Sequence, residues 1–571
     1  MTGKAKRFAP EEVGAIRKPD TGGIHVALVY PNRYSLGMSS LGFQAVYALF
    51  NTHPNVFCER AFYPEPDAPE NARIRTLETQ RPISDVDIIA FSISFENDYP
   101  NLLYILQQAG LPLRSTERSF PHPLVVAGGV AGFLNPEPIA SFIDCFLIGE
   151  AEEIALPFFA CFSDFPPAAL KDRESFLLRM AREVPGAYVP RFYEPSYRPD
   201  GTLEYFYPNA DVPEKIRKVY SKNLSRHPAH SIIVTPDTTF GRSFLVEVSR
   251  GCPHGCRFCA AGYVYRPPRF QSVESLQGSV EAAKGLTDKV GLVGAAVSDH
   301  PEIDTVCADI LVRGMTAGFS SLRADALTGS IFALLKKSKT KTATIAPDAG
   351  SERMRTVINK GMTEVQILEA AQALVENDIL NLKLYFMVGL PTETMEDVEA
   401  IVDLCKHIKH RFLKASRSKG RMGTITVSLN SFVPKPFTPF QWSPMDSVGV
   451  LKEKIRKVKS GLGKVSNIRV HADVPRWALV QGLLSLGDRR VSEVLVSVHE
   501  NQGNWSQTLK TSSINPGFYV HRQKDFNELL PWDFIDHGIQ KEFLKREFRR
   551  AMEAKPSPPC PMESCHACGV C

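Results

Sequence analysis

The sequence predicts an α/β protein in which a doubly wound, Rossmann-like domain precedes a partial (βα)6 barrel of the TIM type and a helical C-terminal extension. Two observations lead to this fold class. Apolar runs of strand length alternate with helical stretches over residues 24–162, and the same alternation returns over residues 243–473. The chain has 571 residues, enough for several domains. We therefore divide it into residues 1–165, 166–242, 243–473 and 474–571.

The first domain is predicted from four apolar runs with helical stretches between them. The strand candidates are residues 25–30, 86–94, 123–129 and 144–150. Apolar strands separated by helices predict a parallel sheet that is covered on both faces. Glycines stand at the ends of these strands, where doubly wound folds bind their ligands.

The connector over residues 166–242 is less regular, with one hairpin predicted around Asp200-Gly201. The barrel follows. Its strand candidates read FLVEVS, KVGLVGAAV, FSSLRAD, KTATIAP, LKLYFMVGL, ITVSLNSF and NIRVHAD. Such repeated βα units predict an active face at the carboxyl ends of the strands. The extension over residues 474–571 is predicted to be helical and to end in a group of cysteines.

The composition is that of an ordinary globular protein. It is 43% hydrophobic and 23% charged, with a formal net charge of +5. This charge is too small to indicate a nucleic-acid partner by itself. No apolar run approaches the roughly 18–20 residues that a membrane helix needs, and the first residues lack the apolar core of a secretory signal. We expect a cytoplasmic protein without a membrane partner.

Three cysteines stand close together directly after the first barrel strand. Cys252, Cys256 and Cys259 have the spacing C-x3-C-x2-C, and the aromatic Phe258 precedes the last of them. A structural zinc site takes four ligands, so three thiolates in one loop fit it poorly. In a [4Fe–4S] cluster each iron takes one protein ligand, so three cysteines leave one iron open to a small molecule. The spacing therefore predicts an iron–sulfur cluster with a free coordination position.

This loop resembles the signature of radical S-adenosylmethionine (SAM) enzymes, and later segments resemble the same superfamily in order. They are GLVGAAVSDHPEI, SLRAD, APDAGSERMRTVINKGMT, LKLYFMVGLPTET and LNSFVPKPFTPFQW. The combination is similar to the branch of radical SAM proteins with an N-terminal cobalamin-binding-type domain. Residues 30–47, 125–153 and 530–547 also resemble a bacterial family of that branch with a C-terminal cysteine cluster.

The resemblance implies a mechanism and a set of contacts. Cys252, Cys256 and Cys259 would hold three irons while the fourth chelates SAM, and a flavodoxin or ferredoxin would supply the electron. Cleavage of SAM would give methionine and a 5′-deoxyadenosyl radical that abstracts hydrogen from the substrate. The residues that would contact SAM are Phe258, Gly294, Ala295, Ser321, Arg323 and Asp348.

The same resemblance implies cobalamin in the first domain. Family members often carry Asp-x-His-x-x-Gly after the first strand, with the histidine on cobalt. Here Asn32, Tyr34 and Gly37 occupy these positions, and a neutral tyrosine is a poor cobalt ligand beside imidazole. The residues that would hold the nucleotide tail are Ser92, Ser94, Gly128, Gly129, Gly149 and Glu150.

Four further cysteines form a second group. Cys560, Cys565, Cys568 and Cys571 have the spacing C-x4-C-x2-C-x2-C, with His566 among them. Four thiolates in so short a segment suit either a second [4Fe–4S] cluster or one zinc ion. Both interpretations stay open from the sequence.

The function predicted first is cobalamin-dependent methylation of an unactivated carbon. A second possibility is sulfur insertion or methylthiolation that uses the C-terminal cluster. A third is a non-catalytic iron–sulfur protein that binds RNA or senses redox state. The substrate is open at this point, since an RNA base, a peptide and a small molecule all fit.

Overall fold

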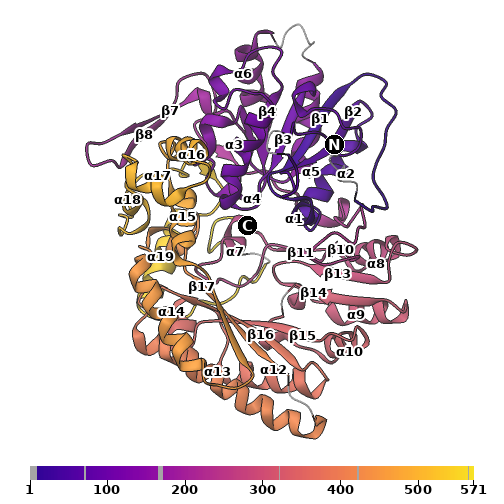
Figure 1. The fold of residues 1–571 in the computed structure, drawn as a ribbon, viewed down its shortest axis with the longest axis vertical. Helices are drawn as coiled ribbons and strands as arrows, with labels where there is room; N and C mark the ends of the chain where they lie inside the picture. Colours follow the sequence, from indigo (N-terminus) through magenta and orange to yellow (C-terminus); the bar gives the residue numbers. More distant parts are fainter. Residues whose placement is uncertain (1–9, 70–71, 165–170, 321, 421–422, 563–564) are drawn as a thin grey trace, which may run out of the picture.

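The computed structural model describes residues 10–69, 72–164, 171–320, 322–420, 423–562 and 565–571. The N-terminal domain and the barrel lie at opposite ends of the molecule, and the C-terminal extension runs along one side of both (Figure 1). The predicted class, a doubly wound domain followed by a partial βα barrel and a helical extension, is confirmed.

The N-terminal domain is built on a six-stranded sheet of order β2-β1-β3-β4-β5-β6. Its strands are β1 (Ile24–Tyr30), β2 (Val56–Phe62), β3 (Ile88–Ser92), β4 (Leu124–Gly128), β5 (Cys145–Leu147) and β6 (Ala187–Tyr188). The first five pair in parallel and β6 is antiparallel. The strand order reverses between β1 and β3, and doubly wound sheets bind ligands outside the carboxyl ends of the strands at such a point.

The strand β2 is absent from the sequence-based prediction, and its composition explains why. Glu59 and Arg60 stand in the middle of its apolar run. The Arg60 guanidinium is nevertheless buried, because it forms ion pairs of 2.7 Å with both Glu12 and Glu78. Charged residues of this kind are tolerated inside a domain only when they are paired.

Helices cover the sheet on both sides. They are α2 (Leu41–Thr52), α3 (Tyr99–Gln108), α5 (Ala151–Ser163) and α6 (Arg173–Glu183). The Ser40 hydroxyl accepts a hydrogen bond from the Phe43 amide and so caps α2. Helix α2 packs against α5, and α3 packs against α16 (Val491–Glu500) of the C-terminal extension.

The barrel consists of a three-stranded and a four-stranded parallel sheet. The strands are β10 (Phe244–Glu247), β13 (Lys289–Val293), β14 (Thr316–Phe319), β15 (Thr342–Asp348), β16 (Asn381–Val388), β17 (Ile425–Ser431) and β18 (Ile468–Ala472). A parallel bridge from Leu322 to Ile345 joins the two sheets. In β16 every second residue is buried, as expected for a strand with one face toward the core. The third strand precedes the SLRAD segment instead of containing it.

Helices pack outside the barrel strands, and all of them except α9 begin at a side-chain cap. They are α8 (Val273–Ala282), α9 (Ile303–Val312), α10 (Gly329–Lys337), α12 (Glu364–Glu376), α13 (Met395–Ser416) and α14 (Val448–Leu462). Helices α12 and α13 both start with a capping box, from Thr363 and Thr394. In the described part of the chain, no helix combines the length and the apolar character needed to cross a membrane.

Two smaller elements connect these parts. The predicted hairpin forms from β7 (Tyr193–Tyr197) and β8 (Leu203–Pro208). Farther along, β19 (Ile535–Asp536) of the extension pairs with β9 (Ile216–Arg217) of the connector. The extension also contains α15 (Pro475–Leu486), α17 (Trp505–Thr511), α18 (Pro516–Val520) and α19 (Lys541–Met552).

The extension holds the first domain through buried polar contacts. The Asn135 amide donates to the carbonyl oxygens of Ser485 and Gly487, at 3.1 and 2.7 Å. Arg489 donates to the buried Glu137 carboxylate at 3.0 Å and to the Tyr188 hydroxyl at 2.8 Å. These contacts fix the relative position of the N-terminal domain and the extension.

Arg489→Ala is expected to lower the free energy of unfolding by about 3–5 kcal/mol, because it leaves the buried Glu137 without its cation. Urea denaturation measures the change. Arg114→Ala is the matched control. Its pair with Glu493 has side chains that are 36% and 61% exposed, so its loss is expected to cost about 0–1 kcal/mol. Equal effects of the two variants would contradict this account.

Candidate active site

A tight turn leads from the barrel into the loop that carries the first three cysteines. The loop begins at β11 (Ser249–Arg250), which pairs with β12 (Arg269–Phe270), and it contains α7 (Ala261–Val264). Gly251 has a φ of +82°, and a Cβ there would lie 2.5 Å from the Tyr265 carbonyl oxygen. Only glycine fits this turn. The pairing of β11 with β12 closes the loop into a ring at one end of the barrel.

The three thiols of this loop are free and close enough to interact electrostatically. Cys256 is buried, and Cys252 and Cys259 are partly buried. Burial raises the pKa of the Cys252 thiol to about 12 and that of Cys256 to about 11, and the neighbouring thiols add to the rise at Cys252. The positive charge of Lys360 acts against this rise and lowers the pKa of the Cys256 and Cys259 thiols. A cluster of thiol ligands with a cation beside it fits an anionic iron–sulfur centre.

Within the ranges that the structure describes, no three His, Cys, Asp or Glu side chains gather closely enough to hold one metal ion. A [4Fe–4S] cluster distributes its thiolates over separate irons, whereas a zinc ion takes all its ligands at one centre.

Two predicted SAM contacts, Asp348 and Arg323, form ion pairs beside the cysteines. Asp348, at the end of β15, has a φ of +62°, and its carboxylate lies 2.6 Å from the Lys360 ammonium. Arg323 pairs with Asp325 at 2.8 Å and interacts electrostatically with Cys256. Asp348 therefore positions Lys360 at the cluster loop. Ser321, another predicted contact, lies outside the described residues.

The end of β13 approaches the cysteine loop closely. A Cβ at Gly294 would lie 2.6 Å from the Ser249 hydroxyl oxygen, so the glycine permits this approach. Nearby, His254 Nε2 and Asp299 Oδ1 lie 2.6 Å apart and connect the loop to the segment after β13. This pair was not predicted from the sequence. Its only signal was the position of Asp299 in a segment that resembles the superfamily.

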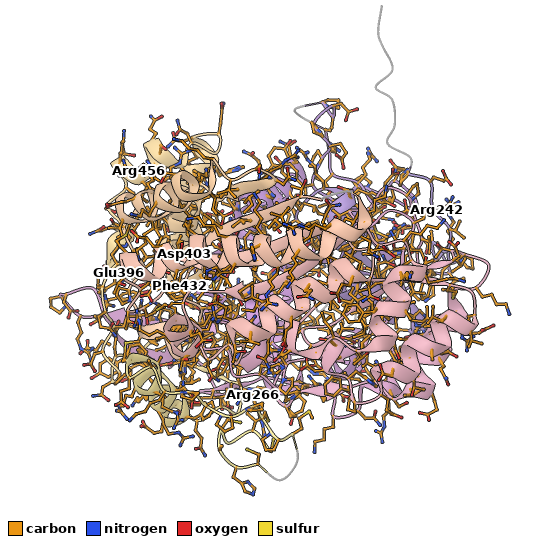
Figure 2. The ribbon with its side chains drawn as sticks, turned by 90° about the horizontal axis from the view of Figure 1, so that it is seen from below. Arg242, Arg266, Glu396, Asp403, Phe432 and Arg456 are labelled. Atoms are coloured by element: carbon orange, nitrogen blue, oxygen red, sulfur yellow. The ribbon has the colours of Figure 1, made fainter. Side chains whose placement is uncertain are left out.

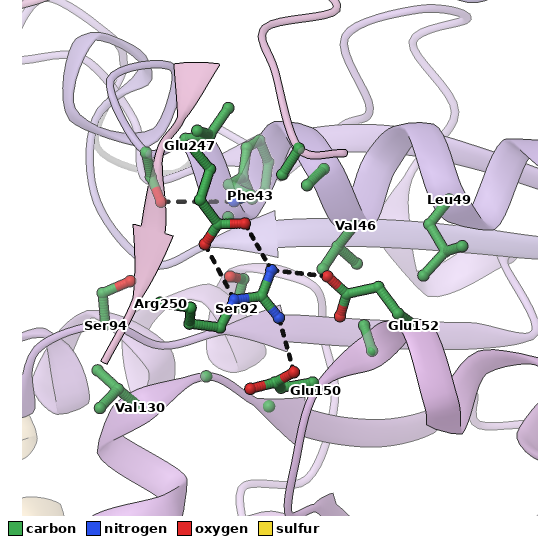
Figure 3. A pocket seen from close by; sticks show the side chains of 18 of the residues that line it. Phe43, Val46, Leu49, Ser92, Ser94, Val130, Glu150, Glu152, Glu247 and Arg250 are labelled. Carbon is green, nitrogen blue, oxygen red and sulfur yellow. Dashed lines mark hydrogen bonds and ion pairs between the residues drawn. The ribbon is translucent and has the colours of Figure 1, made fainter. Parts of the chain in front are cut away.

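A cavity of about 740 Å³ lies between the N-terminal domain and the barrel (Figure 3). Its lining includes the face of α2 with Phe43, Val46 and Leu49, and residues of β10, the start of the cysteine loop and the end of β13. The predicted contacts that line it are Ser92, Ser94, Gly128, Gly129, Gly149, Glu150, Gly294 and Ala295. The fold thus gathers residues predicted for two different ligands around one space.

An ion-pair network crosses one side of this cavity. Arg250 forms ion pairs of 2.8 Å with Glu152 and with Glu247 and of 2.9 Å with Glu150 (Figure 3). Arg269 reaches Glu150 at 2.6 Å. Glu150 belongs to the N-terminal domain and both arginines belong to the cysteine loop. Its carboxylate therefore anchors the loop to the end of β5.

Three predicted cofactor contacts lie outside the lining of this cavity. The Tyr34 hydroxyl donates to Glu12 at 2.5 Å, and its ring packs edge-on against Phe62. Gly37 lies against the same phenylalanine. Phe258 is partly buried and packs against the core. A role of these residues in cofactor binding stays a prediction.

The C-terminal cysteines lie beside the cysteine loop. The Cys560 amide donates to the Pro253 carbonyl oxygen at 2.7 Å. Pro253 lies between Cys252 and Cys256 in the sequence. Cys571 interacts electrostatically with Cys560, Cys565 and Cys568. The fold therefore brings the two cysteine groups, more than 300 positions apart in the sequence numbering, into contact.

Two protein families match parts of this chain. Residues 42–190 match the family described as "Radical SAM proteins, N-terminal", and residues 246–405 match the "Radical SAM superfamily". The "Uncharacterized protein MJ0966" of Methanocaldococcus jannaschii is 31% identical over 475 residues, which cover 82% of this chain and 90% of that protein. A tRNA-2-methylthio-N(6)-dimethylallyladenosine synthase of Anaplasma marginale is 26% identical over 245 residues, 40% of this chain and 53% of that protein.

Solved structures of low sequence identity also match. TsrM of Kitasatospora setae, a radical SAM methyltransferase solved with cobalamin and a [4Fe–4S] cluster, is 12% identical with a TM-score of 0.48, and the match covers 93% of this chain and all of that one. The cobalamin-dependent radical enzyme OxsB with aqua-cobalamin is 15% identical with a TM-score of 0.42, covering 70% of this chain and 56% of that one.

Glu150→Gln is expected to destabilise the protein at neutral pH by about 3–5 kcal/mol, since the buried Arg269 loses its charged partner and Arg250 loses one of three. Burial raises the pKa of Glu150, but hydrogen bonding and charge from Arg269 with charge from Arg250 lower it overall. A carboxyl group whose pKa is depressed in the folded state stabilises the protein at pH values above the ordinary glutamate pKa. This stabilisation is lost as the pH falls below the ordinary pKa and through the folded-state pKa.

The difference in stability between the wild type and Glu150→Gln is measured as the difference between their urea midpoints, from pH 7 to about pH 3. The gap between the wild type and Glu150→Gln is expected to narrow below about pH 4.5. Glu183→Gln, which removes an exposed helical pair with Arg179, is the control and is expected to stay close to the wild type. A gap that widens in acid would contradict the assignment.

Proposed function

The chain belongs to the radical SAM superfamily, and we propose that it is an enzyme that uses a SAM-derived radical for cobalamin-dependent methylation of an unactivated carbon. The observation that supports this proposal most is the interdomain cavity. It adjoins both the carboxyl edge of the N-terminal sheet and the start of the loop with Cys252, Cys256 and Cys259. A reaction that uses two cofactors requires them to face one space.

At the loop, the three cysteines would hold a [4Fe–4S] cluster and leave one iron open. Such a cluster supplies the open iron that chelates SAM and the electron that splits it into methionine and a 5′-deoxyadenosyl radical. Lys360 and Arg323 place positive charge beside Cys256. Gly294 and Ala295, which line the cavity at the end of β13, lie where SAM would approach.

In the cavity, the apolar face of α2 would exclude water from a reactive radical. Ser92, Ser94, Gly128 and Gly129, at the ends of β3 and β4, would hold the nucleotide tail of cobalamin. Bound cobalamin would supply the methyl group, and a second SAM would replace it. Tyr34 lies outside this lining. Tyr34 is therefore not assigned as a cobalt ligand.

The immediate partners follow from the same chemistry. A one-electron donor of the flavodoxin or ferredoxin class supplies the electron for SAM cleavage. The carbon that is methylated belongs to an RNA base, a peptide or a small molecule.

Replacement of Cys252, Cys256 and Cys259 by alanine is expected to abolish SAM cleavage, because the cluster loses all its protein ligands. The measurement is 5′-deoxyadenosine formed after anaerobic reconstitution with iron and sulfide and reduction with dithionite. Cys405→Ala, which changes a buried cysteine of α13, is the control and is expected to retain cleavage. Wild-type protein that holds iron and forms no 5′-deoxyadenosine would contradict the proposed enzyme.

Ala45→Trp is expected to reduce the cobalt bound per chain after reconstitution with hydroxocobalamin, since Ala45 lines the cavity on α2. The tryptophan would occupy space that the cofactor needs. Leu156→Trp is the control, because Leu156 is 67% exposed on α5 and lies outside the lining.

Equal cobalt in the wild type and both variants would contradict the assignment of cobalamin to this cavity. Product formation without cobalt that requires the C-terminal cysteines would instead favour sulfur insertion or methylthiolation.

A further inference from the structure

The C-terminal cysteines have no role in the proposed function, although the fold places them at the loop that carries Cys252, Cys256 and Cys259. This cysteine loop is called the SAM-cluster loop below. The described residues of the segment that carries them, 555–562 and 565–571, are called the cysteine tail below. Figure 2 shows Arg266, a residue of the SAM-cluster loop, beside this tail at the edge of the molecule.

The cysteine tail is hydrogen-bonded to the SAM-cluster loop at its first cysteine. The Cys560 amide donates to the Pro253 carbonyl oxygen at 2.7 Å. Asn359 connects the two segments a second time. Its side-chain amide donates to the Gly255 carbonyl oxygen at 3.2 Å, and its Oδ1 accepts from the Ser557 amide at 2.8 Å.

Arg257 lies at the centre of this contact. It follows Cys256 directly, and its side chain is fully buried. Its guanidinium donates to the Lys555 carbonyl oxygen at 2.8 Å and to the Ser557 hydroxyl at 3.0 Å. It also reaches the Glu547 carboxylate of α19 at 3.2 Å. The planar guanidinium of Arg257 thus binds both the cysteine tail and α19. In the sequence, Arg257 lies between the cluster ligands Cys256 and Cys259.

The cysteines themselves are held against α19 and Arg266. The Gln540 amide donates to the Cys568 carbonyl oxygen at 2.9 Å, and Arg546 donates to the Ala567 carbonyl oxygen at 3.2 Å. The Cys568 thiol is buried and interacts with the Arg266 guanidinium. Cys571 is exposed. The four thiols thus extend from the surface of the protein to the SAM-cluster loop.

We propose that Cys560, Cys565, Cys568 and Cys571 bind a second [4Fe–4S] cluster that passes electrons to the cluster of the SAM loop. The four thiolates give each iron one protein ligand, so no iron stays open for a substrate. The buried guanidinium of Arg266 offsets negative charge at Cys568. A zinc ion would act as a structural staple, but the hydrogen bonds from Arg257, Asn359 and Gln540 already hold the tail in place.

The electron path rests on the proposed function. A one-electron donor of the flavodoxin or ferredoxin class reduces the tail cluster at its exposed side by one electron. The tail cluster returns to its oxidised state when it reduces the SAM-loop cluster. That electron is consumed when the C–S bond of SAM breaks.

The test uses the full chain, reconstituted anaerobically with iron and sulfide. The wild type is expected to hold about eight irons. Cys565→Ser together with Cys571→Ser is expected to reduce this to about four and to remove one of two cluster signals in electron paramagnetic resonance of the reduced protein. His566→Ala is the matched control, because it changes the neighbouring residue and keeps all four thiols. Circular dichroism verifies that each variant is folded.

The electron path has its own measurement. The double variant is expected to lose 5′-deoxyadenosine formation with reduced flavodoxin and to retain it with dithionite, which reaches the SAM-loop cluster directly. Full cleavage with flavodoxin in the double variant would overturn the path.

The two proposals fail in different ways. Wild-type protein with about four irons and one zinc overturns the second cluster. The variant without Cys252, Cys256 and Cys259 is expected to keep about four irons in the tail. Wild-type protein with about eight irons and no SAM cleavage supports the second cluster and overturns the proposed enzyme.

Discussion

The buried carboxylate of Glu150 holds the two halves of the site together. It follows β5 of the N-terminal sheet and forms ion pairs with Arg250 and Arg269, which flank the cysteine loop on either side. Burying three charges costs desolvation energy, and the geometry recovers it only because each arginine has several partners at short distance. The network therefore specifies one relative position of sheet and loop more than it adds stability. The cavity exists because that position is fixed.

The cysteine loop is held by arginines along its whole length, and each of them faces a different part of the protein. Arg250 binds the N-terminal domain, Arg257 binds the cysteine tail and α19, and Arg266 lies beside Cys568. A loop that must present three thiolates to a cluster needs a backbone with little freedom. The planar guanidinium supplies several donors from one side chain. The local composition of the loop thus explains how an irregular segment is held rigid.

Much of the fold could be predicted from sequence, because apolar runs report burial directly. The strands β1, β3, β4 and those of the barrel have such runs. The strand β2 was missed because Arg60 interrupts its run, and its partners Glu12 and Glu78 stand far away in the sequence. Contacts of this kind leave no local pattern. Glu150 and Arg269 are 119 positions apart, and Arg257 and Ser557 are 300 apart. Residue spacing therefore identified the thiols but not the side chains that position them.

The position of Arg257 makes the tail a structural part of the SAM-cluster site before any metal is considered. Without residues 555–557, the Arg257 guanidinium would keep its hydrogen bonds to Glu547 and to the carbonyl oxygens of Thr356 and Val357. The N–H groups that donate to Lys555 and Ser557 would lose their acceptors while they stay buried. Unsatisfied buried donors cost free energy, so the loop would rearrange to recover them. That rearrangement would move Cys256, because it directly precedes Arg257. The geometry of the first thiol group therefore depends on the segment that carries the second.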